Sequence, residues 1–454
     1  MTTDAADTPL AKPGTDSILG REYRATTIAM VALVSLNAFE VLAVAAAMPT
    51  VARELGGLSL YALAFGGILA TSLVGMTVAG RWSDRAGPAG SLWAGMACFV
   101  AGLLLAGLAR DMGTLVAGRL LQGLGAGAFF VALYVIVARL YPERLRPRVF
   151  AAFAAGWVVP SLVGPGISGL IVQHLGWRWV FLAVPLLAVP AAWLLRPGLR
   201  QLAAMPRPAA GEEASGIGWA LGAAAGALAL HLAEHVPAPL RPLAWLGGGA
   251  LLLLCAWRLL PPGTLVLVRG LPSVIALRGV AAAAFFSCEA FVPLLLSRER
   301  GLSPLAAGAA LGAGALGWCC GSWYQGHRLP ETARRRAIRL GSVLLFAGIL
   351  ATAGAAIALP VWVAIAGWTL AGIGMGLLYP SLSVLTLALS PPSRQGRNSS
   401  ALQLSEAMAV TAALAVAGAL FAMLLARPAP LGYAAAFTVS ALLAMVAMAI
   451  VRRV

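Results

Sequence analysis

The sequence predicts an all-α membrane protein built from two pseudo-symmetric six-helix bundles and two additional transmembrane helices. Of its 454 residues, 60% are hydrophobic and 11% are charged, whereas soluble domains carry about 25% charged residues. Apolar stretches recur along the chain, each long enough, at roughly 20 residues, to cross the hydrocarbon core of a bilayer. Parts of the first half of the chain also return in the second half. Together these observations favour a duplicated helical membrane protein.

Fourteen apolar stretches predict fourteen membrane spans. They lie near residues 25–48, 61–81, 90–109, 112–139, 149–174, 178–196, 217–235, 241–260, 272–296, 304–322, 338–357, 360–389, 398–426 and 431–451. The first six are expected to form one bundle and the last six the other. The expected domains are a cytoplasmic N-terminal tail at 1–24, an N-terminal bundle at 25–196, a cytoplasmic linker at 197–216, two extra helices at 217–260 and a C-terminal bundle at 261–454.

The duplication rests on an ordered series of matches. Residues 117–127 read AGRLLQGLGAG, and residues 366–376, which lie 249 positions later, read AGWTLAGIGMG. The same offset pairs Gly123, Gly125, Gly127, Pro142, Arg148 and Gly169 with Gly372, Gly374, Gly376, Pro391, Arg397 and Gly418. A second, gapped match sets Gly80-Arg81-Trp82 against Gly321-Ser322-Trp323. Duplicated membrane halves usually build a pathway at their interface.

The placement of arginine predicts the orientation. With the N-terminus inside, the predicted cytoplasmic segments and the flanks of the spans beside them hold 24 of the 32 Lys and Arg residues, the external ones hold 7, and Arg119 is the remaining one. This is a positive-inside bias. Both termini are therefore expected in the cytoplasm. The net charge of +16 is attributed to this topology and to contact with the lipid bilayer, not to a nucleic-acid surface. Residues 1–24 contain no signal-peptide core, so the first helix is the expected targeting signal for the cell membrane, expected to be a bacterial inner membrane.

Neither an enzyme active site nor a cofactor or metal site is expected. No GxxxxGK[ST] loop occurs and the loops are too short for an ATPase, so transport would use an ion gradient or run downhill. The segment His231-Leu-Ala-Glu234-His235 has the HxxEH spacing of a zinc peptidase. It lies outside the duplicated halves and is interpreted as interfacial polar residues. The five cysteines fall inside apolar stretches without disulfide or metal spacing, which indicates packing residues.

Four motifs occur in order on the predicted helices. The first helix has Glu40 followed by Met48-Pro49, and residues 80–87 after the second helix read GRWSDRAG. The fourth helix has Leu115, Arg119, Gln122 and Gly123, and residues 164–169 in the fifth helix read GPGISG. With Trp177-Arg178-Trp179 opening the sixth helix, they resemble the motifs of the major facilitator superfamily, in its fourteen-helix drug:proton antiporter branch. The sequence departs from that pattern at Pro160, where a glycine is expected, at Ala45, where asparagine is common, and at Pro88, which replaces a basic residue.

The resemblance implies a gating loop and a bendable fifth helix. The loop residues are Gly80, Asp84, Arg85 and Gly87. Asp84 is expected to meet the positive N-terminus of the third helix, or to pair with Arg139 or Arg144 and so close the inner side while the protein faces out. An ordinary capped turn is the alternative. The corresponding position in the second half is Gln325, which predicts a weaker closure there.

The fifth-helix residues are Gly164, Pro165 and Gly169. Proline removes a backbone hydrogen bond and glycine permits close contact, so they predict a thin, bendable segment. The resemblance implies that this segment packs against the other half and limits leakage, and plain packing is the alternative.

Ionisable residues inside a membrane are costly and mark function. Glu40, Arg119 and Glu289 are expected at similar depth in the outer half of a cavity, with Glu406 nearer the cytoplasmic end. Glu40, modulated by Arg119, is predicted to carry the coupling proton, while Glu289 and Glu406 offer further proton or cation sites. A snorkelling or helix-paired residue is the alternative for each. Glu406 has no acidic counterpart in the first half, so its expected partner is a proton or a cationic substrate.

The substrate cavity is expected to be apolar and aromatic. Its predicted polar and aromatic residues are Asn37, Gln122, Trp157, Gln403 and Glu406, and its further aromatic candidates are Trp318, Trp323, Phe285 and Phe286. Such a cavity attracts cations through aromatic faces and dispersed carboxylates.

These features predict a secondary active transporter that exports hydrophobic or cationic small molecules by proton-coupled antiport and alternating access, as in multidrug efflux and antibiotic resistance. An exporter of a lipid, glycolipid or other endogenous metabolite on the same fold is one alternative. A membrane enzyme is another, for which no nucleophile or cofactor loop is found, and a membrane sensor or structural protein is the last. The expected partners are a small-molecule substrate, protons and the lipid bilayer, and the expected state is a monomer.

Overall fold

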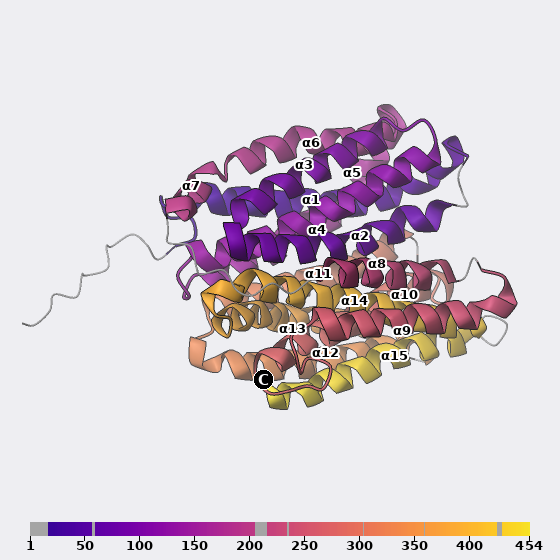
Figure 1. Cartoon of the computed structure of the whole chain (residues 1–454). Helices are drawn as coiled ribbons and strands as arrows, with labels where there is room; N and C mark the ends of the chain where they lie inside the picture. Colours follow the sequence, from indigo (N-terminus) through magenta and orange to yellow (C-terminus); the bar gives the residue numbers. More distant parts are fainter. Residues whose placement is uncertain are drawn as a thin grey trace, which may run out of the picture.

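The computed structural model describes residues 17–56, 60–204, 216–233, 236–302, 304–357, 359–424 and 429–454. Within these residues all regular secondary structure is helical. Figure 1 shows the long helices running side by side in two groups, with the N-terminal group in indigo and magenta and the C-terminal group in orange and yellow.

The N-terminal half contains six long helices and one short one. They are α1 (Arg24–Glu54), α2 (Tyr61–Ala86), α3 (Pro88–Gly107), α4 (Met112–Leu140), α5 (Arg146–His174), α6 (Arg178–Trp193) and the short α7 (Arg196–Ala204). The helix α7 falls at the start of the expected linker. Its Leu199 and Gly198 are buried, and Gly198 lies against Thr26 and Leu140, so packing makes this part of the linker helical.

The other helices follow the expected order. They are α8 (Ile217–Leu232), α9 (Arg241–Leu259), α10 (Leu271–Arg298), α11 (Pro304–His327), α12 (Arg334–Ile357), α13 (Val361–Ala388), α14 (Gln395–Met423) and α15 (Ala429–Ile450). In the part of the chain that the structure describes, ten helices are long and apolar enough to cross a membrane, or eleven if the bent α5 is one span. The helices α2, α8 and α11 are not among these ten or eleven, so the count of fourteen spans stays a prediction.

Each half repeats the same internal packing. In the first, α4 packs against α2 and α3, and in the second α13 packs against α11 and α12. A Cβ atom added at Gly125 would overlap the backbone of α3 at Phe99, and one added at Gly374 would overlap the backbone of α12 at Leu345. The matching glycines of the two halves therefore permit the same close helix contact, as the sequence duplication predicts.

The halves meet through α2 with α14 and through α5 with α11. The additional helix α8 packs against both α2 and α14, and α9 packs against α8 and α14. Figure 1 shows α8 and α9 beside the seam between the two groups of helices. The extra pair thus covers one side of the interface between the halves.

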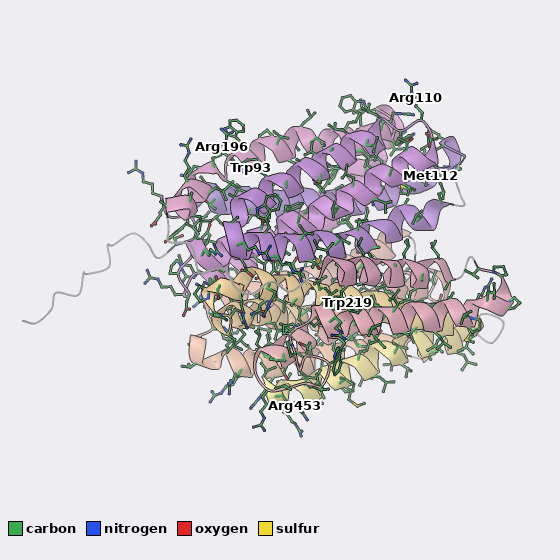
Figure 2. The ribbon with its side chains drawn as sticks, viewed as in Figure 1. Trp93, Arg110, Met112, Arg196, Trp219 and Arg453 are labelled. Carbon is green, nitrogen blue, oxygen red and sulfur yellow. The ribbon has the colours of Figure 1, made fainter. Side chains whose placement is uncertain are left out.

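The two ends of the helix bundle are named here by one residue each. The Asp84 end holds the α2–α3 turn and the start of α14. The opposite end, named the Asp111 end, holds the start of α4, where Asp111 caps the helix by accepting a hydrogen bond from the Thr114 amide. In Figure 2, Arg110 and Met112 lie at the Asp111 end, and Arg196 lies at the other. The Asp84 end is the one that the arginine distribution predicts to be cytoplasmic.

Candidate functional site

The N-terminal half buries an ion pair between α1 and α4. Nη1 of Arg119 donates to Oε1 of Glu40 and, at 2.9 Å, to Oε1 of Gln122, one turn further along α4. Its Nε donates to the Ala64 carbonyl of α2 at 3.2 Å. The side chains of Arg119 and Glu40 are 4% and 1% exposed. Loss of one partner would leave a buried charge uncompensated, which typically costs about 3–5 kcal/mol.

The C-terminal half buries a second ion pair, between α10 and α14. Nε of Arg278 donates to Oε2 of Glu406 at 2.8 Å, and the Tyr379 hydroxyl lies 3.0 Å from both carboxylate oxygens. Nη1 of Arg278 also donates to the Tyr379 carbonyl and to the Ser383 hydroxyl. The guanidinium stacks on the Tyr379 ring at 3.0 Å from the ring centroid, a favourable cation–π contact.

This second pair corrects the sequence interpretation of Glu406. The sequence predicted a proton or a cationic substrate as the partner of Glu406, with a helix-paired residue as the alternative. The structure gives it Arg278 and the Tyr379 hydroxyl, which agrees with the alternative. The positive-inside count assigns Arg278 to the basic residues that flank the predicted spans. Its place several residues inside the apolar stretch 272–296 was the signal that could have identified it, because a guanidinium at that depth requires a partner.

The C-terminal pair also touches the other half of the molecule. Nη2 of Arg278 lies 3.4 Å from the hydroxyl of Tyr134, which belongs to α4. An aromatic cluster extends from Tyr379 within the C-terminal half, through Trp318 at 5.1 Å and Phe285 beyond it. The cluster also holds Phe286 and Trp368. The ion pair therefore connects the half-to-half interface with this aromatic cluster.

Asp84 bridges the two halves at the start of α14. Its Oδ1 accepts from the Gly396 amide at 2.6 Å, and its Oδ2 accepts from the Arg397 amide at 2.7 Å. The positive N-terminus of a helix favours such a carboxylate. A Cβ added at Gly80 would lie only 2.8 Å from the Gly396 carbonyl oxygen, so glycine is needed for this approach.

The helix that Asp84 meets differs from the expectation. The sequence predicted the N-terminus of the third helix or an arginine, and the structure places Asp84 on the first turn of α14, more than 300 residues away. Arg139 donates to the Ser83 carbonyl at 3.1 Å and lies close enough to Asp84 for a favourable electrostatic interaction, in line with the arginine alternative. Gly87 has a φ of 84° and links α2 to α3, while Arg85 is exposed at the same turn.

The corresponding position in the second half makes no such bond. Gln325 is buried at the end of α11, and its Oε1 has no hydrogen-bond partner among the described residues. The next residue, Gly326, approaches the start of α5, where an added Cβ would lie 3.1 Å from the Pro147 carbonyl oxygen. The contact of α2 with α14 and that of α11 with α5 thus lie at equivalent positions of the two halves, but only the first shows the carboxylate-to-amide hydrogen bonds among the described residues.

The helix α5 bends by 48° between Ser161 and Gly166. This is where the sequence predicts a bendable segment, although the side chain of Pro165 lies outside the described residues. Gly164 packs on α1 near Leu42, and the Ser168 hydroxyl donates to the Ala43 carbonyl at 2.6 Å. A Cβ at Gly169 would meet nothing within 4 Å, so Gly169 shows no close contact.

The remaining predicted residues are not gathered into one ring. Among the described residues, Glu289 in α10 has no ion pair or hydrogen bond. Asn37 is buried in α1, and Nε2 of Gln403 lies 3.4 Å from the Ser399 carbonyl. Trp157 is partly exposed on α5.

Two further expectations concern the C-terminal half and the HxxEH segment. Trp323 stacks on His327 at the end of α11 and is exposed, away from the aromatic cluster. No group of three or more His, Cys, Asp or Glu side chains suited to a metal occurs among the described residues. The side chains of His231, Glu234 and His235 lie outside them.

Comparison with known proteins gives one consistent result. The family model described as Major Facilitator Superfamily matches residues 28–409. A "probable multidrug-efflux transporter" of Mycobacterium tuberculosis is 29% identical over 387 residues, which cover 80% of each chain. The human organic anion transporter MFSD10 superposes with a TM-score of 0.69 at 16% identity, covering 94% of this chain and 99% of that one.

A second solved structure, the proton:xylose symporter XylE, has a TM-score of 0.64 at 14% identity and covers 93% of this chain and 94% of its own. At such identities these two structures show the fold alone. The family model and the transporter relative identify a transporter and not an enzyme. The chain is a multi-pass membrane transporter that belongs to the major facilitator superfamily.

Proposed function

We propose that this protein is a proton-coupled exporter of hydrophobic or cationic small molecules that works by alternating access. The observation that carries the proposal is the Glu40–Arg119 pair, which is buried within one half and away from the hydrogen-bonded contacts between the halves. A carboxylate and a guanidinium at that depth are expensive, and such residues mark ion pathways in membrane proteins. The multidrug-efflux relative supports the direction and the substrate class.

The proton step requires the pair to separate. With Arg119 bound to it, Glu40 compensates a buried positive charge, and a neutral group there would leave that charge without a partner. We propose that the change between the two access states draws α1 away from α4. The carboxylate then takes a proton from one side and returns it to the other when the pair forms again.

The closed Asp84 end supports the access cycle. Asp84 holds the first turn of α14, and α5 meets α11 near Gly326. If the Asp84 end is cytoplasmic, as the positive-inside bias predicts, this state is closed toward the cytoplasm. Substrate would then leave toward the Asp111 end.

The substrate region that we propose is the surface formed by Tyr379, Trp318 and Phe286 beside Glu406. Aromatic faces bind hydrophobic and cationic molecules. Glu406 is already paired, so a cationic substrate would exchange with Arg278 for the carboxylate and would not meet a free charge. Glu289 is proposed as an additional proton site in the same half.

The experiment is efflux of a cationic dye from proteoliposomes with an imposed proton gradient. Wild-type protein should drive efflux that a protonophore abolishes, and Glu40→Gln should lose the driven component while it still binds dye. Glu143→Gln is the matched control, because Glu143 is an exposed carboxylate in a surface ion pair. Driven efflux at the wild-type rate in Glu40→Gln, or wild-type efflux that persists with a protonophore, would refute the proposal. Glu40→Asp keeps the charge and should retain part of the driven rate.

A further inference from the structure

A cavity of about 340 Å³ lies in the C-terminal half at the Asp84 end. Its walls come from three places: the residues before α10, the first turns of α12 and the residues after α15. The lining residues are Arg269, Gly270, Arg335, Ile338, Arg339 and residues 451–454. Pockets that hold small ligands are typically about 300–1,000 Å³, so this cavity has room for a single headgroup-sized molecule.

Five of the lining residues are arginines, namely Arg269, Arg335, Arg339, Arg452 and Arg453. All five are exposed. No Asp or Glu side chain is among the described residues that line the cavity. None of the five arginines forms an ion pair with an Asp or Glu side chain among the described residues. Nη1 of Arg453 donates to the Leu267 carbonyl at 3.0 Å, which holds it at the wall. The starts of α10 and α12 add the positive ends of two helix dipoles.

Such a site selects a phosphate group. Guanidinium groups bind phosphate oxygens through paired, charge-assisted hydrogen bonds. Five like charges that line one cavity repel one another, and an anion between them relieves that repulsion. A single carboxylate would satisfy at most part of this charge, whereas a phosphate offers several acceptor oxygens in different directions.

The surface next to the cavity is apolar. Leu340 and Val343 on α12, one to two turns from the arginines, are exposed, as are Met445 and Val446 on α15. The helices α12 and α15 pack together. Figure 2 shows Arg453, one of the lining residues, at the edge of the molecule farthest from the N-terminal half. In a membrane protein such an exposed apolar face contacts lipid chains.

We propose that this cavity binds the phosphate headgroup of an anionic phospholipid whose acyl chains lie along α12 and α15. The arginines recognise the phosphate, and the apolar face beside them accepts the chains. This site is separate from the two intramembrane ion pairs and does not depend on the proposed transport function. It fixes one lipid against the C-terminal half at the Asp84 end.

The test is native mass spectrometry of the purified protein with phosphatidylglycerol, with phosphatidylcholine of the same acyl chains, and with inorganic phosphate. Wild-type protein should retain phosphatidylglycerol in preference to phosphatidylcholine. Arg335→Gln with Arg339→Gln should weaken phosphatidylglycerol binding about thirtyfold, since each arginine near an anionic headgroup contributes about 1 kcal/mol. Arg269→Gln with Arg452→Gln removes two charges from the residues before α10 and after α15 and should give the same loss.

The control is Arg200→Gln with Arg336→Gln. These arginines are exposed at the same end, one in α7 and one in α12, and do not line the cavity. The control should bind phosphatidylglycerol as the wild type does. An equal loss in the control would show a general charge effect and overturn the site. Displacement of the lipid by inorganic phosphate at equal concentration would show a free-phosphate site and overturn the lipid assignment.

Discussion

Both halves of the molecule bury one arginine–glutamate pair, but they build it in opposite ways. In the N-terminal half the acid comes from the first helix, α1, and the arginine from the fourth, α4. In the C-terminal half the arginine comes from the first helix, α10, and the acid from the fifth, α14. The N-terminal carboxylate is 1% exposed, and the C-terminal one is 18% exposed.

The two ion pairs also differ in whether they contact the opposite half of the molecule. The bonds of Arg119 stay within its own half, to Glu40, Gln122 and the Ala64 carbonyl. Arg278 also reaches Tyr134 across the interface. A change in the relative position of the halves must therefore alter the surroundings of the C-terminal pair directly, whereas it reaches the N-terminal pair only through movement of α1 and α4. We infer that the C-terminal pair senses the conformation and that the N-terminal pair carries the proton.

The largest expected effect comes from removing one charge of either pair. Glu40→Gln leaves Arg119 buried without its counter-charge, and Glu406→Gln does the same to Arg278. Each should destabilise the protein by about 3–5 kcal/mol, and neutralising both partners should restore most of it. Unfolding in detergent of the single variants and of the two double variants measures this. Double variants as unstable as the single variants would show that the two partners of each pair do not compensate each other's buried charge.

For Glu406 the structure also changes the expectation about substrates. Since Glu406→Gln leaves Arg278 unpaired, export of neutral and cationic compounds should fall together. Arg278→Gln with Glu406→Gln should then recover neutral export more than cationic export. Transport of a matched neutral and cationic pair of dyes in vesicles distinguishes these outcomes. A selective loss of cationic export in Glu406→Gln alone would mean that Arg278 does not need the Glu406 carboxylate as its partner.

The next effect concerns the contact at Asp84. Asp84→Asn weakens two charge-assisted bonds to the first turn of α14, which are each worth about 1.5–3 kcal/mol. The Asp84 end should open more often, so a cysteine placed at the buried Ser400 in a cysteine-free background should react with a maleimide at least about tenfold faster. Asp111→Asn, at the other end, should leave that rate unchanged. An unchanged rate in Asp84→Asn would show that the contact does not hold the end closed.

The equivalent position in the second half should matter much less. Gln325 makes no hydrogen bond through Oε1 among the described residues, so Gln325→Leu should change the same labelling rate only about twofold or less, that is by under about 0.5 kcal/mol. A change of the labelling rate in Gln325→Leu as large as that in Asp84→Asn would show that the two half-to-half contacts are equally strong. The same maleimide labelling rate at Ser400→Cys is measured for both variants, so their effects can be compared directly.

The effect expected of Tyr134 lies between those of Asp84 and Gln325. Its hydroxyl lies 3.4 Å from Nη2 of Arg278, which is a long hydrogen bond. Tyr134→Phe should shift the balance between access states by about 0.5–1.5 kcal/mol without loss of stability. Tyr324→Phe, at an exposed tyrosine of α11, is the control. The Ser400→Cys labelling rate is again the readout. Identical rates in the two variants would show that the Tyr134 hydroxyl does not influence the balance between access states.

Much of the fold was predictable because membrane helices are long and uniformly apolar. The predicted stretches coincide with the long helices to within several residues, and the glycine series of α4 and α13 has the same packing role in both halves. The sequence also placed Glu40 and Arg119 at similar depth and predicted that Arg119 modulates Glu40. Both side chains carry a charge inside an apolar stretch, which is a signal that sequence shows directly.

Contacts that rely on backbone or on distant segments were not predictable in the same way. Asp84 binds backbone amides at the start of α14, and an amide has no residue identity that a sequence pattern could show. Tyr379 and Tyr134 are uncharged and look like ordinary packing residues in a sequence. Arg278 was misassigned because a basic residue near the end of a span equally fits the positive-inside rule.

The measurement that tests the central claim most directly is proton release from purified protein in weakly buffered detergent when a cationic dye is added. Wild-type protein and Glu143→Gln are expected to release protons on dye binding, whereas Glu40→Gln is expected to bind the dye and release none. Proton release from Glu40→Gln equal to that of the wild type would contradict the assignment of the coupling proton to Glu40.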